Sequence, residues 1–316
     1  MKINLQYFYF QSEREKFTQL SLTDENKEVY EYVQYIGRGG YGTVIKARKV
    51  GKSGQFYAIK SFPSIEDEND EEYQAFQDTL HIANVVKAFS LIKKEQFTHI
   101  VMEMLEGGDF WDYLCNYGPI PKLKALTLFA KLVTTVGELL QIGLYPGDIK
   151  AENLFYDKKR KALKILDLGG FKHMRKKNGL NKKVATSCFS PPEYHLEEEP
   201  SKKEKHNFGE LHLSWTLGLL FWHMLSGEQK TIQSLYDIKQ FELNISSNIK
   251  DLQGSETFYL VIKLLALNPA KRMKFWSLHK ILGKSTYSFC IPLPSPLLQS
   301  HFSGNSKAFK HSQGES

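Results

Sequence analysis

A glycine-rich segment between two strand-like stretches limits the fold of this chain more than any other feature. Residues 30–36 alternate polar and apolar side chains, and the alternation returns in 42–47, so each stretch is predicted to be a half-buried strand. The segment has the spacing G-x-G-x-x-G-x-V and consists of Ile36, Gly37, Arg38, Gly39, Gly40, Tyr41, Gly42, Thr43 and Val44. A dinucleotide-binding fold would need a helix directly after the glycines. The hairpin therefore favours a loop folded over phosphates, with a glycine-rich hairpin that binds no ligand as the alternative.

Beyond this hairpin the patterning changes from strand-like to helix-like near Gly108. Short turns join the strand-like stretches, which predicts an antiparallel meander. After the change, residues 122–142 carry an apolar stripe at helical spacing that ends at Gly143. The predicted strands that follow the hairpin are residues 55–62, 85–90 and 98–104, and one amphipathic helix is predicted over 70–80.

Composition and charge predict a globular cytoplasmic protein. The 316 residues are 41% hydrophobic, which is enough to bury a sizeable core. The longest apolar stretch, residues 213–225, is shorter than the ~20 residues of a membrane span, so we expect a buried core helix there and no span. We see neither an apolar leader nor a disulfide framework among Cys115, Cys188 and Cys290. The net charge is +7, but the basic clusters lack interleaved aromatic residues, so no nucleic-acid partner is expected.

A lysine on the strand after the hairpin completes a familiar pattern. Lys60 closes a Y-A-I-K sequence eighteen residues after Gly42. Together with the glycines it resembles the eukaryotic protein kinase family, and further motifs follow in family order over residues 30–282. The resemblance implies an α+β, bilobal protein-kinase-like fold. Its expected parts are an N-lobe over 30–104 with a five-stranded antiparallel sheet and one helix, a hinge and mainly helical C-lobe over 105–282, an N-terminal extension over 1–29 and a flexible C-terminal tail over 283–316.

The resemblance implies a binding site for ATP between the two lobes. Lys60 would hold the α- and β-phosphates beneath the glycine-rich loop. It would pair with an acid of the helix, for which Glu72 is the candidate and Glu71 the alternative. Met102 would be the gatekeeper beside adenine. The other positions implied to contact adenine or ribose are Val44, Ala58, Glu103, Leu105, Asp109 and Phe155.

A second block of motifs resembles the catalytic machinery of the family. Residues 146–153 match H-R-D-L-K-x-x-N at Asp148, Lys150 and Asn153. The resemblance implies that Asp148 accepts the proton of the substrate hydroxyl, that Lys150 neutralises the γ-phosphate and that Asn153 binds a second Mg²⁺. Asp167, in a D-L-G sequence, would bind the Mg²⁺ that bridges the phosphates. Two acids at these spacings, with the asparagine and both lysines, argue against unrelated surface acids.

Later residues resemble the structural and specificity elements of the family. Glu193, in a P-P-E sequence, is expected to form a buried ion pair with Arg272. Thr186 stands seven residues before Glu193, where Ser/Thr kinases link this loop to the catalytic residues. Lys150 and Thr186 together resemble the Ser/Thr-specific pattern. The implied substrate is thus a protein with a Ser or Thr acceptor, and the oligomeric state is left open.

Three substitutions depart from the family pattern. Pro146 and Gly147 stand where the family has His and Arg, and Leu213 stands where an aspartate usually anchors the catalytic loop. Without the arginine, a phosphate on the activation loop loses its main partner, so one hypothesis is an active kinase that needs no such phosphate. The other is a pseudokinase that binds nucleotide or a partner protein. The retained charged residues favour the active kinase.

The sequence gives conflicting indications of substrate preference. Glu152 favours a basic residue near the target hydroxyl, whereas the basic segment 172–183 favours acidic substrates. No consensus sequence is predicted.

Overall fold

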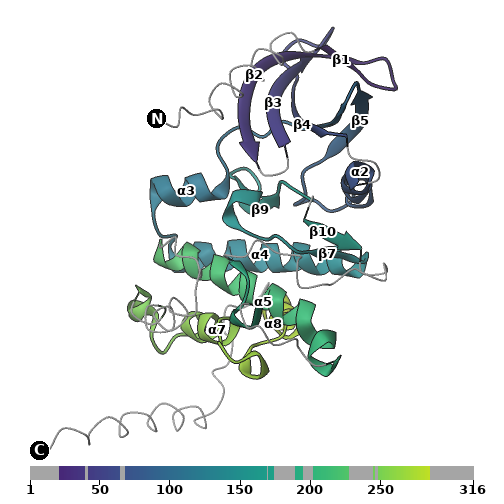
Figure 1. Cartoon of the computed structure of the whole chain (residues 1–316). Coiled ribbons are helices and arrows are strands. Elements are labelled where there is room, and N and C mark those ends of the chain that lie inside the picture. The colour runs from purple at the N-terminus through teal and green to yellow at the C-terminus, as the bar shows by residue number, and fades with distance from the viewer. Residues whose placement is uncertain are drawn as a thin grey trace, which may run out of the picture.

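The chain is described by a computed structural model over residues 21–39, 42–64, 68–168, 170–173, 189–194, 202–227, 245 and 248–284. A sheet with one helix forms the N-lobe, and the elements that follow β6 form the C-lobe below it (Figure 1). The strands are β1 (Ser21–Thr23), β2 (Val29–Gly39), β3 (Gly42–Lys49), β4 (Phe56–Pro63), β5 (Ala88–Lys94), β6 (Phe97–Glu103), β7 (Leu144–Pro146), β8 (Leu154–Asp157), β9 (Ala162–Ile165) and β10 (Phe171–His173). The helices are α2 (Glu68–Asp78), α3 (Phe110–Tyr117), α4 (Lys122–Gln141), α5 (Lys202–Ser226), α7 (Glu256–Leu264) and α8 (Phe275–Lys284). The single-turn 3-10 helices include η1 (Ala151–Asn153) and η3 (Pro192–Tyr194).

The N-lobe sheet has six strands in the order β1-β2-β3-β4-β6-β5, and all neighbours are antiparallel. The prediction of five strands was therefore wrong. The sixth strand, β1, lies in the segment expected to be an N-terminal extension and pairs with β2. Its single buried apolar residue, Leu22, pairs with Tyr30. A strand of three residues is too short to show an alternating pattern, so the sequence did not predict it.

Most predicted elements form close to their expected residues. Helix α4 matches the prediction over 122–142, and Gly143 follows it with a positive φ of 84° that favours glycine. The strand expected over 85–90 instead begins at Ala88. Val85 forms a parallel bridge with Ile165, and the Val86 amide donates to the Ile165 carbonyl at 2.8 Å. This segment therefore joins the N-lobe to β9.

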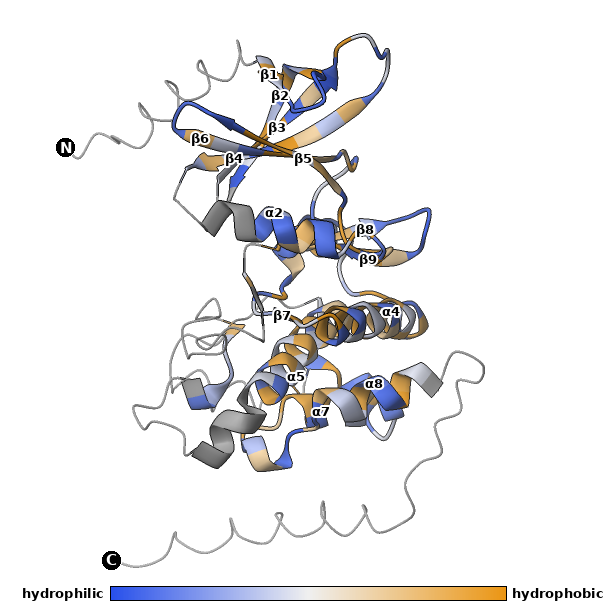
Figure 2. Cartoon of the chain, turned by 90° about the vertical axis from the view of Figure 1, so that its right-hand side faces the viewer, coloured by the Kyte–Doolittle hydropathy of each residue, from blue (hydrophilic) through white to orange (hydrophobic). Residues whose placement is uncertain are grey.

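Helix α5 forms the centre of the C-lobe core. The Phe221 ring of α5 stacks on Phe129 of α4 with centroids 4.2 Å apart. Gly218 lets α7 approach closely, because a Cβ at this position would lie 2.6 Å from the Cβ of Leu264. Figure 2 shows apolar residues gathered where these helices meet. The buried core helix predicted over residues 213–225 is thus confirmed. None of the helices described is both long and apolar enough to cross a bilayer.

A buried histidine in the N-lobe sheet makes stability depend on pH. His99 of β6 is buried, and its Nδ1 lies 2.8 Å from Ser61 Oγ of β4. Burial lowers the pKa of His99 from 6.5 to about 4, and the Lys94 ammonium adds to the shift. In the unfolded chain His99 is therefore protonated as the pH falls below about 6.5, whereas in the folded chain it is protonated only near pH 4. The contribution of His99 to stability is complete above pH 6.5 and is lost as the pH falls toward 4.

Replacing His99 by asparagine is expected to flatten the acid side of the stability curve. A pKa difference of this size corresponds to about 3 kcal/mol of unfolding free energy between pH 6.5 and 4. Urea unfolding at several pH values would measure the slope, with the exposed His81→Asn as the matched control. Equal slopes for His99→Asn and the native chain would contradict the prediction.

Candidate active site

The buried Lys60 joins both lobes through two ion pairs. Lys60 comes from β4, Glu72 from α2, and Asp167 follows β9. The Lys60 Nζ lies 2.7 Å from Glu72 Oε1 and 3.0 Å from Asp167 Oδ1. The structure thus pairs Lys60 with Glu72, while the side chain of the alternative, Glu71, lies outside the described residues. One lysine in this arrangement connects the sheet, the helix and the D-L-G segment.

The electrostatics of this centre keep the lysine charged. Burial disfavours the ammonium of Lys60, but Glu72 and Asp167 outweigh burial and raise its pKa. Burial also raises the pKa of Glu72 to about 7, where Lys60 opposes the shift and the charge of Asp167 adds to it. The centre therefore presents a fixed cation beside two carboxyl groups. A cation of this kind suits the binding of a polyphosphate.

The second charged group surrounds Asp148. The Lys150 Nζ donates to Asp148 Oδ2 at 2.7 Å, and the Asn153 Nδ2 donates to the same oxygen at 3.0 Å. Asn153 also donates to the Asp148 carbonyl at 2.9 Å, which closes the loop on itself. These three residues are brought together by the tight turn that leads into η1. Donors on one carboxylate oxygen stabilise its charge and fix its direction.

A backbone hydrogen bond brings the two charged groups next to each other. The Leu166 amide donates to the Asn153 carbonyl at 2.9 Å, so Asp167 follows directly beside the Asn153 backbone. Asp167 supplies a carboxylate and Asn153 an amide oxygen, which are the hard oxygen ligands that Mg²⁺ prefers. Within the described ranges, no cluster of three His, Cys, Asp or Glu side chains stands ready for a metal. The donor set fits an Mg²⁺ ion that takes its remaining ligands from phosphates and water.

Gly170 packs directly against the Asp148 backbone. A Cβ on Gly170 would lie 2.7 Å from the Cβ of Asp148, closer than real Cβ atoms approach one another. The Gly147 amide donates to the Gly170 carbonyl at 3.3 Å. The loop that carries Asp148 is therefore held against the segment that follows Asp167. Any side chain at position 170 must therefore displace Asp148 or its own loop.

For the phosphate transfer that the family resemblance implies, we expect Gly170→Ala to lower kcat by roughly tenfold or more, because a shift of about 1 Å in a reacting group is costly. The matched control is Gly283→Ala in α8, where an added Cβ meets nothing within 4 Å. Steady-state phosphate transfer would measure both variants. Unchanged kcat in Gly170→Ala would show that the loop absorbs the methyl group without moving Asp148.

The predicted hinge contains a buried ionic connection that the sequence did not reveal. The Glu103 amide donates to the Lys87 carbonyl at 2.9 Å, so the expected adenine contact of Glu103 rests on its carbonyl. The Glu103 carboxylate accepts from the Lys87 amide at 2.7 Å and from the buried Lys164 Nζ at 2.5 Å. The Lys87 ammonium in turn donates to carbonyls after α2, those of Thr79, Leu80 and Ile82. The end of α2, the hinge and β9 are therefore tied together.

The structure places the other predicted nucleotide contacts around this hinge. Val44 and Ala58 are half-buried on adjacent strands β3 and β4, and Met102 is buried at the end of β6. Phe155 lies below the hinge, where a Cβ on Gly107 would meet its ring at 3.4 Å. Asp109 is engaged as the N-cap of α3 and accepts from the Asp112 amide at 2.8 Å. Its role toward ribose and that of Leu105 remain predictions.

The glycine-rich hairpin and the activation segment are described only in part. Strands β2 and β3 pair up to Gly39 and Gly42, which places Ile36, Gly37, Arg38, Thr43 and Val44 beside the hairpin. Gly40, Tyr41, Gly169 and Thr186 lie outside the described residues.

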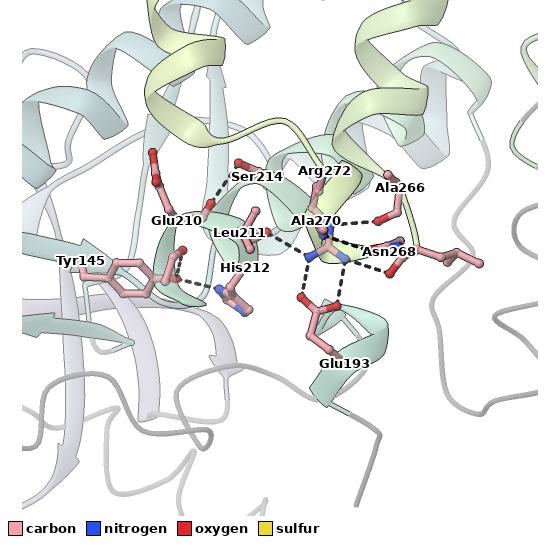
Figure 3. Close-up of polar contacts among 12 residues, drawn as sticks. Tyr145, Glu193, Glu210, Leu211, His212, Ser214, Ala266, Asn268, Ala270 and Arg272 are labelled. Atoms are coloured by element: carbon pink, nitrogen blue, oxygen red, sulfur yellow. Dashed lines mark hydrogen bonds and ion pairs between the residues drawn. The ribbon is translucent and has the colours of Figure 1, made fainter. Parts of the chain in front are cut away.

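The predicted ion pair between Glu193 and Arg272 is confirmed. Arg272 donates from Nη1 to Glu193 Oε1 at 2.6 Å and from Nη2 to Oε2 at 2.8 Å (Figure 3). Arg272 also donates to the carbonyls of Ala266 and Leu211 and lies over the Trp215 ring at 4.9 Å. This bidentate pair fixes η3, at the end of the activation segment, to α5 and to the loop before α8.

Comparison with known proteins identifies the family. A family model described as protein kinase domain matches residues 30–283, and the chain therefore belongs to the protein kinase family.

The chain is similar to parts of longer serine/threonine or calcium-dependent protein kinases. The chain is 27% identical to probable serine/threonine-protein kinase HSL1 of Saccharomyces cerevisiae, over 60% of this chain and 12% of that protein. It is 26% identical to calcium-dependent protein kinase 25 of Arabidopsis thaliana, over 79% of this chain and 49% of that protein. It is also 26% identical to calcium/calmodulin-dependent protein kinase type 1 of Caenorhabditis elegans, over 64% and 57%. The chain thus spans at most 57% of the length of these relatives.

Proposed function

We propose that this chain is a serine/threonine protein kinase that transfers the γ-phosphate of Mg-ATP to a hydroxyl group of a protein. The observation that carries the proposal is the pair of charged groups, Lys60 with Glu72 and Asp167, and Asp148 with Lys150 and Asn153. Kinase-type transfer depends on positioning and charge neutralisation, and these are the residue types that provide them. The serine/threonine assignment is supported by Lys150 and by the names of the relatives.

Each residue has a role that its surroundings support. Asp148, whose Oδ2 is held by Lys150 and Asn153, orients the acceptor hydroxyl and takes its proton. The hydroxyl oxygen forms a bond to the γ-phosphorus as the bond to the bridging oxygen breaks, which leaves ADP. Lys150 offsets the charge of the transferred group, and Lys60 holds the α- and β-phosphates. Asp167 and Asn153 would hold Mg²⁺, which when bound neutralises charge on the phosphates.

We further propose that activity does not require a phosphate on the activation loop. Gly147 has no side chain, so the catalytic loop offers no cation at the position where an arginine would bind such a phosphate. The same substitution, with Pro146 and Leu213, supports the second candidate function, a pseudokinase that binds nucleotide without transferring phosphate. Both candidate functions predict nucleotide binding, but only the active kinase is expected to transfer phosphate.

A transfer assay with γ-labelled ATP on casein, as an acidic substrate, and histone, as a basic one, tests the proposal. We expect incorporation that needs Mg²⁺, survives treatment of the protein with phosphatase, and is lost in Asp167→Asn. A thermal-shift titration with Mg-ATP runs in parallel, because a ligand of the native state raises Tm. A Tm shift without incorporation would support the pseudokinase, and the absence of both would reject both candidates.

A further inference from the structure

A buried tyrosine and histidine join the catalytic loop to helix α5 at the place where the family anchor is missing. The Tyr145 hydroxyl lies 2.9 Å from the Gly209 carbonyl. It also lies 2.8 Å from Nδ1 of His212 (Figure 3). Tyr145 is 3% exposed and His212 1% exposed, so neither hydrogen bond competes with bulk water. Leu213, the neighbour of His212, is fully buried and supplies only apolar packing.

The geometry fixes the direction of both hydrogen bonds. The Tyr145 hydroxyl has one proton, and the Gly209 carbonyl can only accept it. The Nδ1 of His212 must then donate to the Tyr145 oxygen, which assigns its proton to Nδ1. Burial lowers the pKa of His212 to about 4, with Arg272 as a second cause, so the imidazole is neutral at pH 7 and its single ring proton lies on Nδ1.

The position of Tyr145 in the chain lets this contact act on two functional loops. Tyr145 is the middle residue of β7 and stands three residues before Asp148. Strand β7 pairs with β10, where Tyr145 is opposite Lys172, shortly after Asp167. The link between Gly147 and Gly170 continues this pairing. Fixing Tyr145 on α5 therefore fixes both the loop of Asp148 and the loop of Asp167.

The same turn of α5 also receives the activation segment. Arg272, which holds Glu193, donates to the Leu211 carbonyl at 3.3 Å, one residue before His212. Helix α5 thus binds Tyr145 through the Gly209 carbonyl and His212. Its Leu211 carbonyl accepts from Arg272 (Figure 3). The turn is a common support for the elements that meet at the site.

We propose that Tyr145 and His212 are positioning residues for phosphoryl transfer, and that they hold the catalytic loop on α5 in place of the missing aspartate. They act through the loop backbone and touch neither ATP nor the acceptor hydroxyl. This role rests on the proposed kinase function, and the experiment separates the two.

The test compares three single variants with the native chain. Tyr145→Phe keeps the ring and loses both hydrogen bonds, and His212→Leu removes the donor. His212→Asn keeps an amide donor near the position of Nδ1. We expect the first two to lower kcat ten- to a hundredfold with KM for ATP changed less than twofold, and His212→Asn to recover most of the lost rate. The double variant Tyr145→Phe with His212→Leu is expected to be no slower than the slower single variant, because both remove one shared contact.

Hydrogen–deuterium exchange provides a readout that needs no activity. In Tyr145→Phe and His212→Leu, amides of residues 144–153 are expected to exchange faster, while those of α4 keep their rates. Unchanged kcat in both variants of an active enzyme would overturn the proposal. So would exchange that accelerates uniformly with no recovery in His212→Asn, which indicates general destabilisation. If the native chain transfers no phosphate, the proposed function fails, and the exchange of residues 144–153 alone decides the positioning role.

Discussion

Asp148→Asn is expected to lower kcat by about 10²- to 10⁴-fold, the range that a general base contributes. Asparagine has nearly the same shape, so the hydrogen bonds from Lys150 and Asn153 can still be accepted by its amide oxygen. It lacks the basic oxygen that receives the proton of the acceptor hydroxyl in the proposed reaction. The loss should therefore appear in turnover, while the rise in Tm caused by Mg-ATP persists.

The matched control for this result is Asp251→Asn. Asp251 is exposed in a 3-10 turn of the C-lobe, far along the chain from the charged groups. Initial rates with γ-labelled ATP and saturating substrate would give kcat for both variants. If Asp148→Asn and Asp251→Asn have the same kcat as the native chain, the assignment of Asp148 is wrong.

Arg272→Met is expected to lower the free energy of unfolding by about 3–5 kcal/mol, because it leaves the Glu193 carboxylate without its partner in a largely buried place. The Arg272 side chain is 0% exposed and that of Glu193 17% exposed. The change also removes donors from the Leu211 and Ala266 carbonyls. Methionine retains much of the apolar volume over the Trp215 ring, so the loss is mainly electrostatic.

A surface ion pair of the same residue types provides the control. Arg48 and Glu31 are 2.8 Å apart with side chains 64% and 42% exposed, so Arg48→Met should cost less than about 1 kcal/mol. Adding Glu193→Gln to Arg272→Met should recover part of the loss by removing the unpaired charge. Urea unfolding measures all three variants. A cost for Arg272→Met no larger than that for Arg48→Met would show that burial does not strengthen the pair.

The charged residues of the site were predictable because each stands in a short motif of its own. Lys60 follows the glycines on a strand, and Asp148 and Asn153 share one loop, so the resemblance of these motifs to those of the family was sufficient to select them. The choice between Glu71 and Glu72 was different. Adjacent residues on a helix point in directions about 100° apart, so the pairing depends on how α2 lies against β4. The structure pairs Lys60 with Glu72.

Other parts of the site depend on contacts between distant residues. Glu103 and Lys164 are 61 residues apart, and Tyr145 and His212 are 67 apart. No local pattern identifies these residues. In the sequence, a lysine within a buried strand and a histidine within a core helix only interrupt an apolar stretch, and their partners are distant. Strand β1 was missed for a related reason. Its three residues are too few to show a strand pattern, and they form a strand by pairing with β2.

The sequence by itself indicated the change from strands to helices, the family resemblance and the charged residues of the proposed site, because periodicity and motif spacing are local properties of the chain. It also located the departures at Pro146, Gly147 and Leu213. Only the tertiary structure showed which side chains lie beside the Asp148 loop where the sequence lacks the expected aspartate. The fold brings the Tyr145 side chain of β7 to His212 of α5, and burial makes that hydrogen bond strong by excluding water.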